Sequence, residues 1–184
     1  MFPPQLIVEH RVLGAASISS KKRLLETLAE LLVGELPELS RESVFDRLLE
    51  RERLGSTGLG HGVALPHARV AEVTDAIGAF VQMREPVPFD AIDDQPVDLA
   101  FALLVPETAN EMHLQLLADL AALFNQDQLR QKLRDAEGPD ALLALLTEAA
   151  PAEAAPSSSP ANSPASSPTS SLPSSPPDGS PRRS

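Results

Sequence analysis

The sequence contains no cysteine, no tryptophan and no tyrosine, and each absence removes a class of function. Without cysteine the chain cannot form disulfides, zinc sites built on thiolates or a cysteine nucleophile. Six phenylalanines are the only large aromatic side chains, so stacking platforms for nucleic-acid bases are poorly supported. Any nucleophile in this protein must therefore be His, Ser, Thr, Lys or a carboxylate.

Basic residues and long apolar runs are also scarce. The 15 Lys and Arg are outnumbered by 26 Asp and Glu, which gives a formal net charge of −11. Binding to a phosphate backbone requires clustered basic residues, so we expect no nucleic-acid partner. The longest apolar run, residues 99–105, is far too short to cross a bilayer, and the N-terminus lacks the pattern of a signal peptide. We therefore expect a cytoplasmic protein that is not embedded in a membrane and whose partners are other proteins.

The composition changes abruptly near Pro151. From this residue to Ser184 the sequence is almost entirely Ser, Pro and Ala, and it holds half of the 18 prolines. Such a segment cannot bury enough apolar surface to offset the entropy lost on ordering. We predict one domain over residues 1–149 and a disordered tail over residues 150–184, to which we assign no function.

Several helices are expected in the domain. Ser20 can cap a helix whose leucines follow the i, i+3/i+4 spacing and which ends near Gly34. Ser40 can cap a second amphipathic helix, which stops at Gly55. Later helical patterns span residues 110–124, 126–136 and 139–149.

Apolar runs between these helices predict strands. They cover residues 63–65, 76–83 and 97–105, and each is closed by proline or polar residues. Residues 85–95 have the Pro and Asp content of a turn or hairpin. Helices, then strands, then helices around one core indicate an α/β or α+β sandwich.

His67 stands out because of the residues that precede it. The segment Gly-Ser-Thr-Gly-Leu-Gly-His-Gly at residues 55–62 predicts a loop whose glycines allow positive φ and close approach of another group. Pro66 closes the strand that follows, so we expect His67 at the carboxyl end of a strand, where ligands gather in open α/β sheets. A neutral imidazole is nucleophilic at pH 7, and its attack on phosphorus would give a transferable phosphoramidate.

Hydrogen-bond donors should surround such a histidine, because phosphoryl transfer depends on positioning and charge stabilisation. Arg51, at the end of the second predicted helix, can pair with phosphate oxygens. Ser56 and Thr57 offer hydroxyls, and glycines such as Gly58 leave backbone N–H groups accessible. The competing interpretations are an ordinary connector for the loop and a structural role for His67. Taken separately, each of these would be the better explanation.

Two other histidines have weaker claims. His113 shares a predicted helix face with Leu116 and Leu120. It can be a core residue, or a second imidazole that meets His67 and donates to the phosphoryl group; periodicity does not choose between these. His61 and His67 could share a metal only with a third ligand, and none is evident, so we predict no metal site. Phosphate-loop, Gly-x-Ser-x-Gly and His-Glu-x-x-His motifs are absent.

The stretch from Arg51 to His67, Arg-Glu-Arg-Leu-Gly-Ser-Thr-Gly-Leu-Gly-His-Gly-Val-Ala-Leu-Pro-His, resembles the enzyme IIA domains of the phosphoenolpyruvate-dependent phosphotransferase system. The pattern is that of the fructose/mannitol superfamily and is most similar to its nitrogen-regulatory branch. The resemblance covers approximately residues 2–149, and the Ser/Pro tail departs from it. The motifs that support this branch are Pro-Phe-Asp-Ala-Ile-Asp at 88–93, Pro-Val-Asp-Leu at 96–99, Phe-Ala-Leu-Leu-Val-Pro at 101–106 and His-Leu at 113–114.

The resemblance implies a fold and a set of roles. The implied fold is a mixed sheet of about five strands flanked by helices on both faces. His67 would accept a phosphoryl group from a phosphorylated HPr-like carrier, with His113 beside it and Arg51 helping to hold the phosphate. The loop that contains Ser56 and Thr57 would lie nearby. No metal or organic cofactor is needed, because the group arrives on a protein carrier.

Three functions stay open at this point. The first is a regulatory phosphocarrier of the nitrogen-type system, whose phosphorylation alters its binding to a sensor kinase, a transporter or a metabolic enzyme. The second is a sugar-specific enzyme IIA, which passes the phosphoryl group to an enzyme IIB during fructose- or mannitol-type uptake. The third is a ligand-binding or scaffold module in which His67 is structural.

Overall fold

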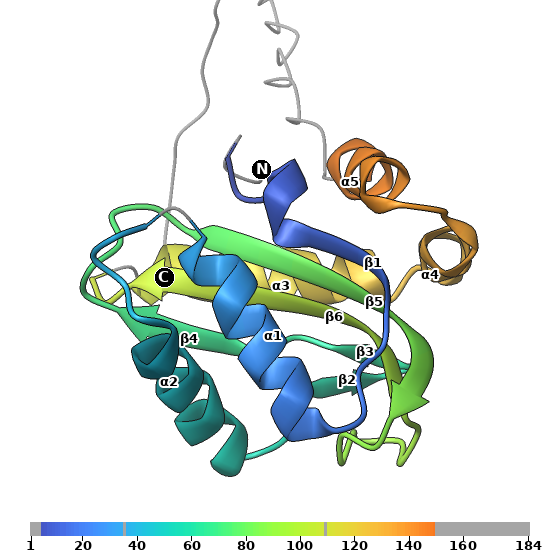
Figure 1. The fold of residues 1–184 in the computed structure, drawn as a ribbon, viewed down its shortest axis with the longest axis horizontal. Coiled ribbons are helices and arrows are strands. Elements are labelled where there is room, and N and C mark those ends of the chain that lie inside the picture. The colour runs from blue at the N-terminus through green and yellow to red at the C-terminus, as the bar shows by residue number, and fades with distance from the viewer. Residues whose placement is uncertain (1–4, 35, 109, 150–184) are drawn as a thin grey trace, which may run out of the picture. The chain divides into compact units, whose positions relative to one another are not determined.

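The computed structural model describes residues 5–34, 36–108 and 110–149 (Figure 1). The predicted tail lies outside these residues, so its boundary and its disorder stay predictions. In chain order the elements are η1 (Glu9–Arg11), β1 (Val12–Ala16), α1 (Lys21–Val33), α2 (Arg41–Arg53), β2 (Gly58–Gly60), β3 (Val63–Ala64), β4 (His67–Val70), β5 (Ile77–Val87), β6 (Val97–Pro106), α3 (Asn110–Phe124), α4 (Asp127–Asp135) and α5 (Pro139–Glu148).

The helices begin and end close to the predicted residues. The Ser20 hydroxyl accepts a hydrogen bond from the backbone N–H of Arg23 at 3.1 Å and so caps α1. Ser40 caps α2 in the same way, through the N–H of Ser43 at 3.0 Å. α3, α4 and α5 match the three later helical patterns to within one residue at each end.

Six strands form one mixed sheet. Their order is β1-β5-β6-β3-β2, and β4 also pairs with β6. β5 and β6 are antiparallel, whereas β1 joins β5 in parallel. β3 and β4 pair in parallel with successive stretches of β6, so they follow one another along the same strand. The predicted mixed sheet is confirmed, with six strands where about five were expected.

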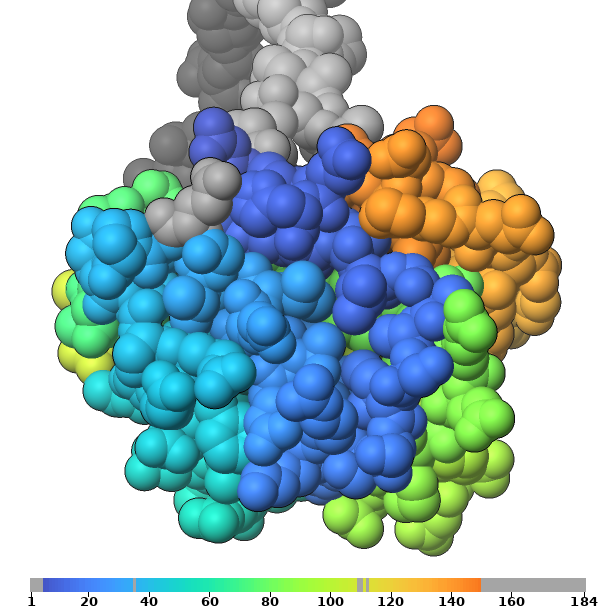
Figure 2. Space-filling model, in the orientation of Figure 1, coloured from blue at the N-terminus to red at the C-terminus, as the bar shows by residue number. Residues whose placement is uncertain are grey.

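Helices cover both faces of this sheet, as predicted. Along β6, Ala102 and Leu104 pack in the core cluster that contains the buried faces of α1 and α2. Their neighbours Phe101 and Leu103 pack in the second cluster, with α3, α4 and α5. This alternation follows from the two-residue period of a strand. α1 and α2 lie in front of the sheet in Figure 1, and Figure 2 shows their side chains covering that face.

The segment around His67 differs from the prediction. The expected loop over residues 55–62 contains β2, which pairs antiparallel with β3. His67 is the first residue of β4 and lies opposite Leu103 of β6. The prediction that it lies at the carboxyl end of a strand is therefore wrong. Pro66 lacks an N–H and interrupts the pairing, but its carbonyl accepts a hydrogen bond from the N–H of Leu103 at 2.9 Å, and the chain continues along β6.

None of the helices in the part of the chain that the structure describes has the length and apolarity needed to span a bilayer. The predicted cytoplasmic location stays a prediction.

Candidate functional site

His67 is held in one tautomer by two hydrogen bonds. Its Nδ1 lies 3.0 Å from the carbonyl oxygen of Leu65, an acceptor, so Nδ1 carries the proton. Its Nε2 accepts a hydrogen bond from the Nε–H of Arg51 at 3.1 Å. A ring protonated at Nδ1 has its lone pair on Nε2, so Nε2 is the nucleophilic atom of this histidine.

Arg51 lies in the last turn of α2, and its guanidinium is fixed at two points. The Nε–H donates to His67, and Nη1 donates to the carbonyl oxygen of Gly55 at 3.0 Å. α2 packs beside β4, which brings the helix end to the imidazole. A planar guanidinium anchored in this way presents further N–H groups for an anion at Nε2.

His113 reaches the same place from the other face of the sheet. It lies on α3, and its ring centroid is 5.5 Å from that of His67. The side chain is buried, with 5% exposure, and its Nδ1 has no hydrogen-bond partner among the described residues. The structure therefore brings together all three residues predicted to act in catalysis, Arg51, His67 and His113.

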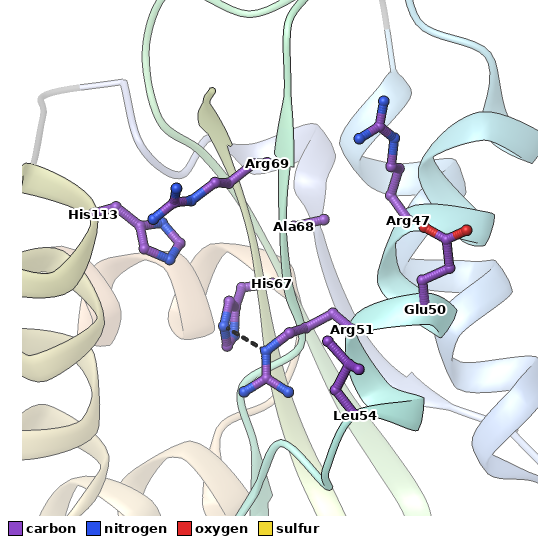
Figure 3. A pocket seen from close by; sticks show the side chains of 8 residues that line it. All are labelled: Arg47, Glu50, Arg51, Leu54, His67, Ala68, Arg69 and His113. Carbon is purple, nitrogen blue, oxygen red and sulfur yellow. Dashed lines mark hydrogen bonds between the residues drawn. The ribbon is translucent and has the colours of Figure 1, made fainter. Parts of the chain in front are cut away.

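These residues line an open pocket at the start of β4 (Figure 3). In Figure 3, Arg51 reaches His67 from α2, and His113 lies on the opposite side of the imidazole. Sequence reasoning named three of the lining residues. The others are Arg47, Glu50, Leu54, Ala68 and Arg69.

Two of the missed residues carry a signal that periodicity could have revealed. Arg47 precedes Arg51 by four residues and so lies on the same face of α2. Arg69 follows His67 by two residues and so points to the same side of β4. Both are arginines in a chain with a formal net charge of −11, and with Arg51 they give the pocket a basic lining.

Both imidazoles of the pocket are held neutral at pH 7. Burial lowers the pKa of His67, opposed by the hydrogen bond to Leu65 and assisted by the positive charge of Arg51. Burial also lowers the pKa of His113, to about 4, with further contributions from His67, Arg69 and Arg51. Desolvation disfavours the charged imidazolium, so the His67 lone pair stays available near neutral pH.

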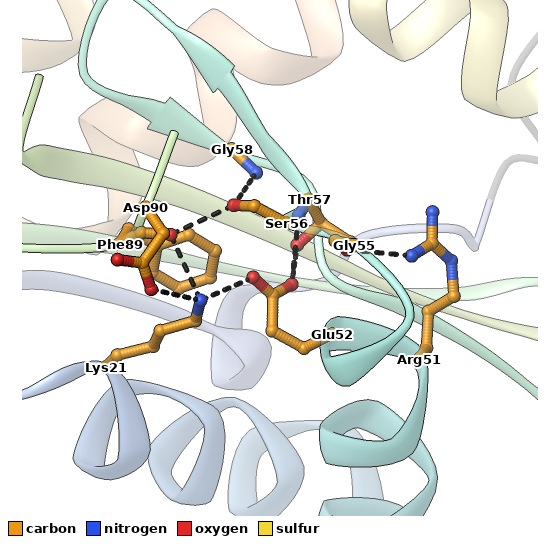
Figure 4. Close-up of polar contacts among 9 residues, drawn as sticks. All are labelled: Lys21, Arg51, Glu52, Gly55, Ser56, Thr57, Gly58, Phe89 and Asp90. Atoms are coloured by element: carbon orange, nitrogen blue, oxygen red, sulfur yellow. Dashed lines mark hydrogen bonds and ion pairs between the residues drawn. The ribbon is translucent and has the colours of Figure 1, made fainter. Parts of the chain in front are cut away.

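The three residues predicted to bind phosphate lie elsewhere (Figure 4). The Ser56 hydroxyl donates to the carbonyl oxygen of Phe89 at 2.9 Å and accepts from the N–H of Gly58 at 3.1 Å. The Thr57 hydroxyl and N–H both donate to Oε2 of Glu52. None of the three lines the pocket, so the structure does not bring the predicted phosphate ligands to His67.

Gly58 has a different reason to be glycine. A Cβ built on this residue would lie 2.6 Å from the Cβ of Ala91 and 2.8 Å from its Cα. Contacts this close are not tolerated, so the glycine allows β2 to approach the turn after Phe89. Gly58 is thus explained by packing between two parts of the chain rather than by a bound phosphate.

His61 is also separate from the pocket. It is exposed in the turn between β2 and β3, where its N–H donates to Asp93 at 2.7 Å and its carbonyl accepts from Arg134 at 2.7 Å. It does not line the pocket of His67. Over residues 5–34, 36–108 and 110–149 no group of three His, Asp or Glu side chains could hold a metal ion.

Comparison with known proteins gives the family. The family described as "Phosphoenolpyruvate-dependent sugar phosphotransferase system, EIIA 2" matches residues 5–149. The chain is 43% identical over 144 residues to the nitrogen regulatory protein of Pseudomonas aeruginosa, which covers 78% of this chain and 94% of the relative. It is 44% identical over 138 residues to that of Escherichia coli K12, covering 73% and 84%. The chain therefore belongs to this enzyme IIA family of the phosphotransferase system.

Solved structures agree with this assignment. The nitrogen regulatory protein IIA-Ntr of Neisseria meningitidis superimposes with a TM-score of 0.71 at 48% identity, covering 77% of this chain and 96% of that one. The mannitol IIA protein of Escherichia coli shares the fold, with a TM-score of 0.64 at 24% identity over 76% of this chain and 98% of that one. The predicted resemblance to the nitrogen-regulatory branch is confirmed, and it supports a phosphocarrier role in the phosphotransferase system.

Proposed function

We propose that this protein is a regulatory phosphocarrier of the nitrogen-type phosphotransferase system, which accepts a phosphoryl group on Nε2 of His67 from a phosphorylated HPr-like carrier. The observation that carries the proposal is the hydrogen bonding of the imidazole. The Nδ1–H bond to Leu65 places the lone pair on Nε2, and Nε2 faces the guanidinium of Arg51 in an open pocket.

The transfer step follows from this geometry. The Nε2 lone pair attacks phosphorus, a nitrogen–phosphorus bond forms, and the bond from phosphorus to the carrier breaks with its electron pair leaving on the carrier. The Nδ1 proton stays on the hydrogen bond to Leu65 throughout. Arg51 exchanges its bond to Nε2 for bonds to the phosphoryl oxygens, which stabilises the charge that they carry.

His113 has a second role in this proposal. Its neutral ring carries one N–H, and its Nδ1 is buried without a partner among the described residues. An unsatisfied imidazole beside the acceptor can donate to, or be ordered by, a phosphoryl group on Nε2. The close approach of the two rings, 5.5 Å between centroids, supports this role over that of an ordinary core residue.

Regulation rests on charge. A phosphoryl group adds about −1.5 to −2 charges at pH 7, and it would do so at the mouth of a pocket lined by three arginines. Leu54 lies at this mouth with 86% exposure, so a partner that covers the pocket contacts both an apolar side chain and the new charge. We infer that regulated targets, whether a sensor kinase, a transporter or a metabolic enzyme, distinguish the two forms by this charge.

The proposal is tested with phosphoenolpyruvate, enzyme I and an HPr-type carrier. We expect intact-mass measurement to show one acid-labile phosphoryl group on the wild-type chain and none on His67→Ala. A wild-type chain that takes no label, or a His67→Ala chain that takes as much, would exclude the phosphocarrier function. Either of these results would favour a binding module in which His67 is structural.

A sugar-specific enzyme IIA is the second candidate, and one relative favours it. The chain is 36% identical over 130 residues to a protein of Haloferax volcanii named as a fructose-specific EIIA component, covering 71% of this chain and 84% of the relative. Chasing the phosphorylated protein with membranes and fructose or mannitol separates the two. We expect little sugar phosphate; efficient sugar phosphorylation would replace the regulatory proposal with the sugar-specific one.

A further inference from the structure

A buried carboxylate lies directly behind the candidate site, where a helix dipole opposes it. Glu52 follows Arg51 in the last turn of α2, and its side chain is only 3% exposed. The C-terminal end of a helix carries a partial negative charge, so a carboxylate there is unfavourable without a compensating cation. Lys21 supplies that cation, with Nζ 2.8 Å from Oε1 of Glu52.

Lys21 is also at the disfavoured end of its own helix. It is the first residue of α1, where the partial charge of the helix is positive. Its ammonium is shared among Glu52, the carbonyl oxygen of Phe89 and Asp90, each within 3.1 Å, and it lies 4.6 Å from the centroid of the Phe89 ring. Burial lowers the pKa of Lys21, but hydrogen bonds and attraction to the two carboxylates outweigh it and leave the pKa raised. The amine therefore stays charged beside Glu52.

Glu52 connects the Lys21 ammonium to the loop after α2, in which the carbonyl oxygen of Gly55 holds the Arg51 guanidinium. Its Oε2 accepts from the N–H of Thr57 at 3.0 Å and from the Thr57 hydroxyl, which folds the chain after α2 back onto the helix. Inside that closed loop the carbonyl oxygen of Gly55 accepts from Nη1 of Arg51 at 3.0 Å. Figure 4 shows the carboxylate of Glu52 between the Lys21 ammonium and Thr57, while Arg51 reaches Gly55 on the outer side of the loop.

We propose that Glu52, held by Lys21, is a positioning residue for Arg51: its bonds to Thr57 shape the loop whose Gly55 carbonyl fixes the guanidinium against Nε2 of His67. Neither Glu52 nor Lys21 lines the pocket, so neither touches the reacting group. The charge of Glu52 also raises the pKa of His67, and a comparison of Arg51 positioning must therefore hold that charge constant. The effect on phosphoryl transfer rests on the proposed function, whereas the effect on the geometry of Arg51 does not.

A matched pair of double variants tests this inference. Lys21→Met combined with Glu52→Gln removes both charges but keeps an acceptor for Thr57, and Lys21→Met combined with Glu52→Leu removes both charges and the acceptor. Because neither variant buries an unpaired charge, both are expected to fold. Their comparison isolates the hydrogen bonds that shape the loop.

Two measurements follow on these variants. In proton–nitrogen correlation spectra without any carrier, the Nε–H signal of Arg51 should stay slow to exchange in the glutamine variant and be lost in the leucine variant. With phosphoenolpyruvate, enzyme I and an HPr-type carrier, kcat for labelling should fall about tenfold more in the leucine variant than in the glutamine variant, with the carrier KM within about twofold.

An added Arg51→Ala change separates positioning from general stabilisation. If Glu52 acts through Arg51, the leucine and glutamine variants should label at the same rate, within about twofold, once Arg51 is absent. A tenfold difference that persists in this background would overturn the inference, as would an Arg51 signal that survives in the leucine variant. If no variant, including the wild type, takes label, the proposed function fails, while the Arg51 signal still decides the positioning role.

Discussion

The two sides of the segment that joins α2 to β2 differ in how completely their polar groups are satisfied. On the pocket side, the buried Nδ1 of His113 has no partner among the described residues, and Nε2 of His67 accepts a hydrogen bond from Arg51 that an anion could replace. On the other side, Oε2 of Glu52 accepts two hydrogen bonds from Thr57, and Oε1 of Glu52 forms an ion pair with Lys21. The satisfied groups fix the backbone, whereas the incompletely satisfied ones can bind a ligand.

Removing Arg51 should have the largest effect on the pocket side. We expect Arg51→Ala to slow labelling of His67 by about 100-fold, because the phosphoryl oxygens lose their charged donor. Arg53→Ala is the matched control, since Arg53 is exposed in the same turn of α2 and does not line the pocket. Initial rates of labelling by intact mass would measure both. Equal rates for the two variants would contradict the role of Arg51.

Replacing His113 should give the next largest effect, and the result decides whether His113 acts in phosphoryl transfer or is an ordinary core residue. We expect His113→Leu to slow labelling about tenfold while leaving the thermal midpoint equal or higher, because an apolar side chain replaces a buried ring with an unpartnered nitrogen. The measurements are labelling rates and thermal unfolding on the same samples. A variant that is less stable but labels at the wild-type rate would make His113 a core residue.

The helices of this fold could be predicted from the sequence because their signals are local. Ser20 and Ser40 cap α1 and α2 through side-chain contacts three residues away, so the boundaries are evident without tertiary information. β1 and β4 gave no such signal. β4 is four residues long and is a strand because it pairs with β6. The burial of β1 alternates, but its sequence does not, because Leu13 on the exposed side is apolar and Gly14 has no side chain.

In the candidate site, too, some features could be predicted from the sequence and others could not. Arg51, His67 and His113 could be predicted because nucleophile, cation and second imidazole each have a distinctive side chain and a matching family motif. The direction of the Thr57 hydroxyl could not be predicted, because it depends on Glu52, whose buried charge depends in turn on Lys21 in another helix. The Ser56 hydroxyl likewise depends on a distant group, the carbonyl oxygen of Phe89. The sequence pattern gives the residues of such a network but not which of them face one another.

The pH dependence of stability also distinguishes the two sides, because His67 and His113, whose pKa values are lowered by burial, both line the pocket. An unfolded His113 binds a proton near its ordinary pKa of 6.5, whereas the folded one does so only near 4. The unfolded chain therefore binds more protons in this window, and stability falls as pH falls. Between pH 7 and pH 5 we expect His113 to account for a loss of about 1–2 kcal/mol in the free energy of unfolding.

Urea unfolding at the two pH values measures this loss. His113→Leu should be less sensitive to pH than the wild type by that amount, and His10→Gln, at an exposed histidine outside the pocket, should behave like the wild type. The same pH sensitivity in all three chains would show that His113 is not held neutral by the pocket.

The smallest effect on transfer should come from Ser56, and it tests the division between the two sides most directly. Its hydroxyl is used by Phe89 and Gly58 and lies outside the pocket, so Ser56→Ala should leave the labelling rate of His67 within about twofold of the wild type. The lost hydrogen bonds should instead lower the free energy of unfolding by about 1 kcal/mol, measured in urea. A tenfold slower transfer at unchanged stability would mean that the Ser56 hydroxyl turns to the phosphoryl group during the reaction, and the two sides would then form a single site.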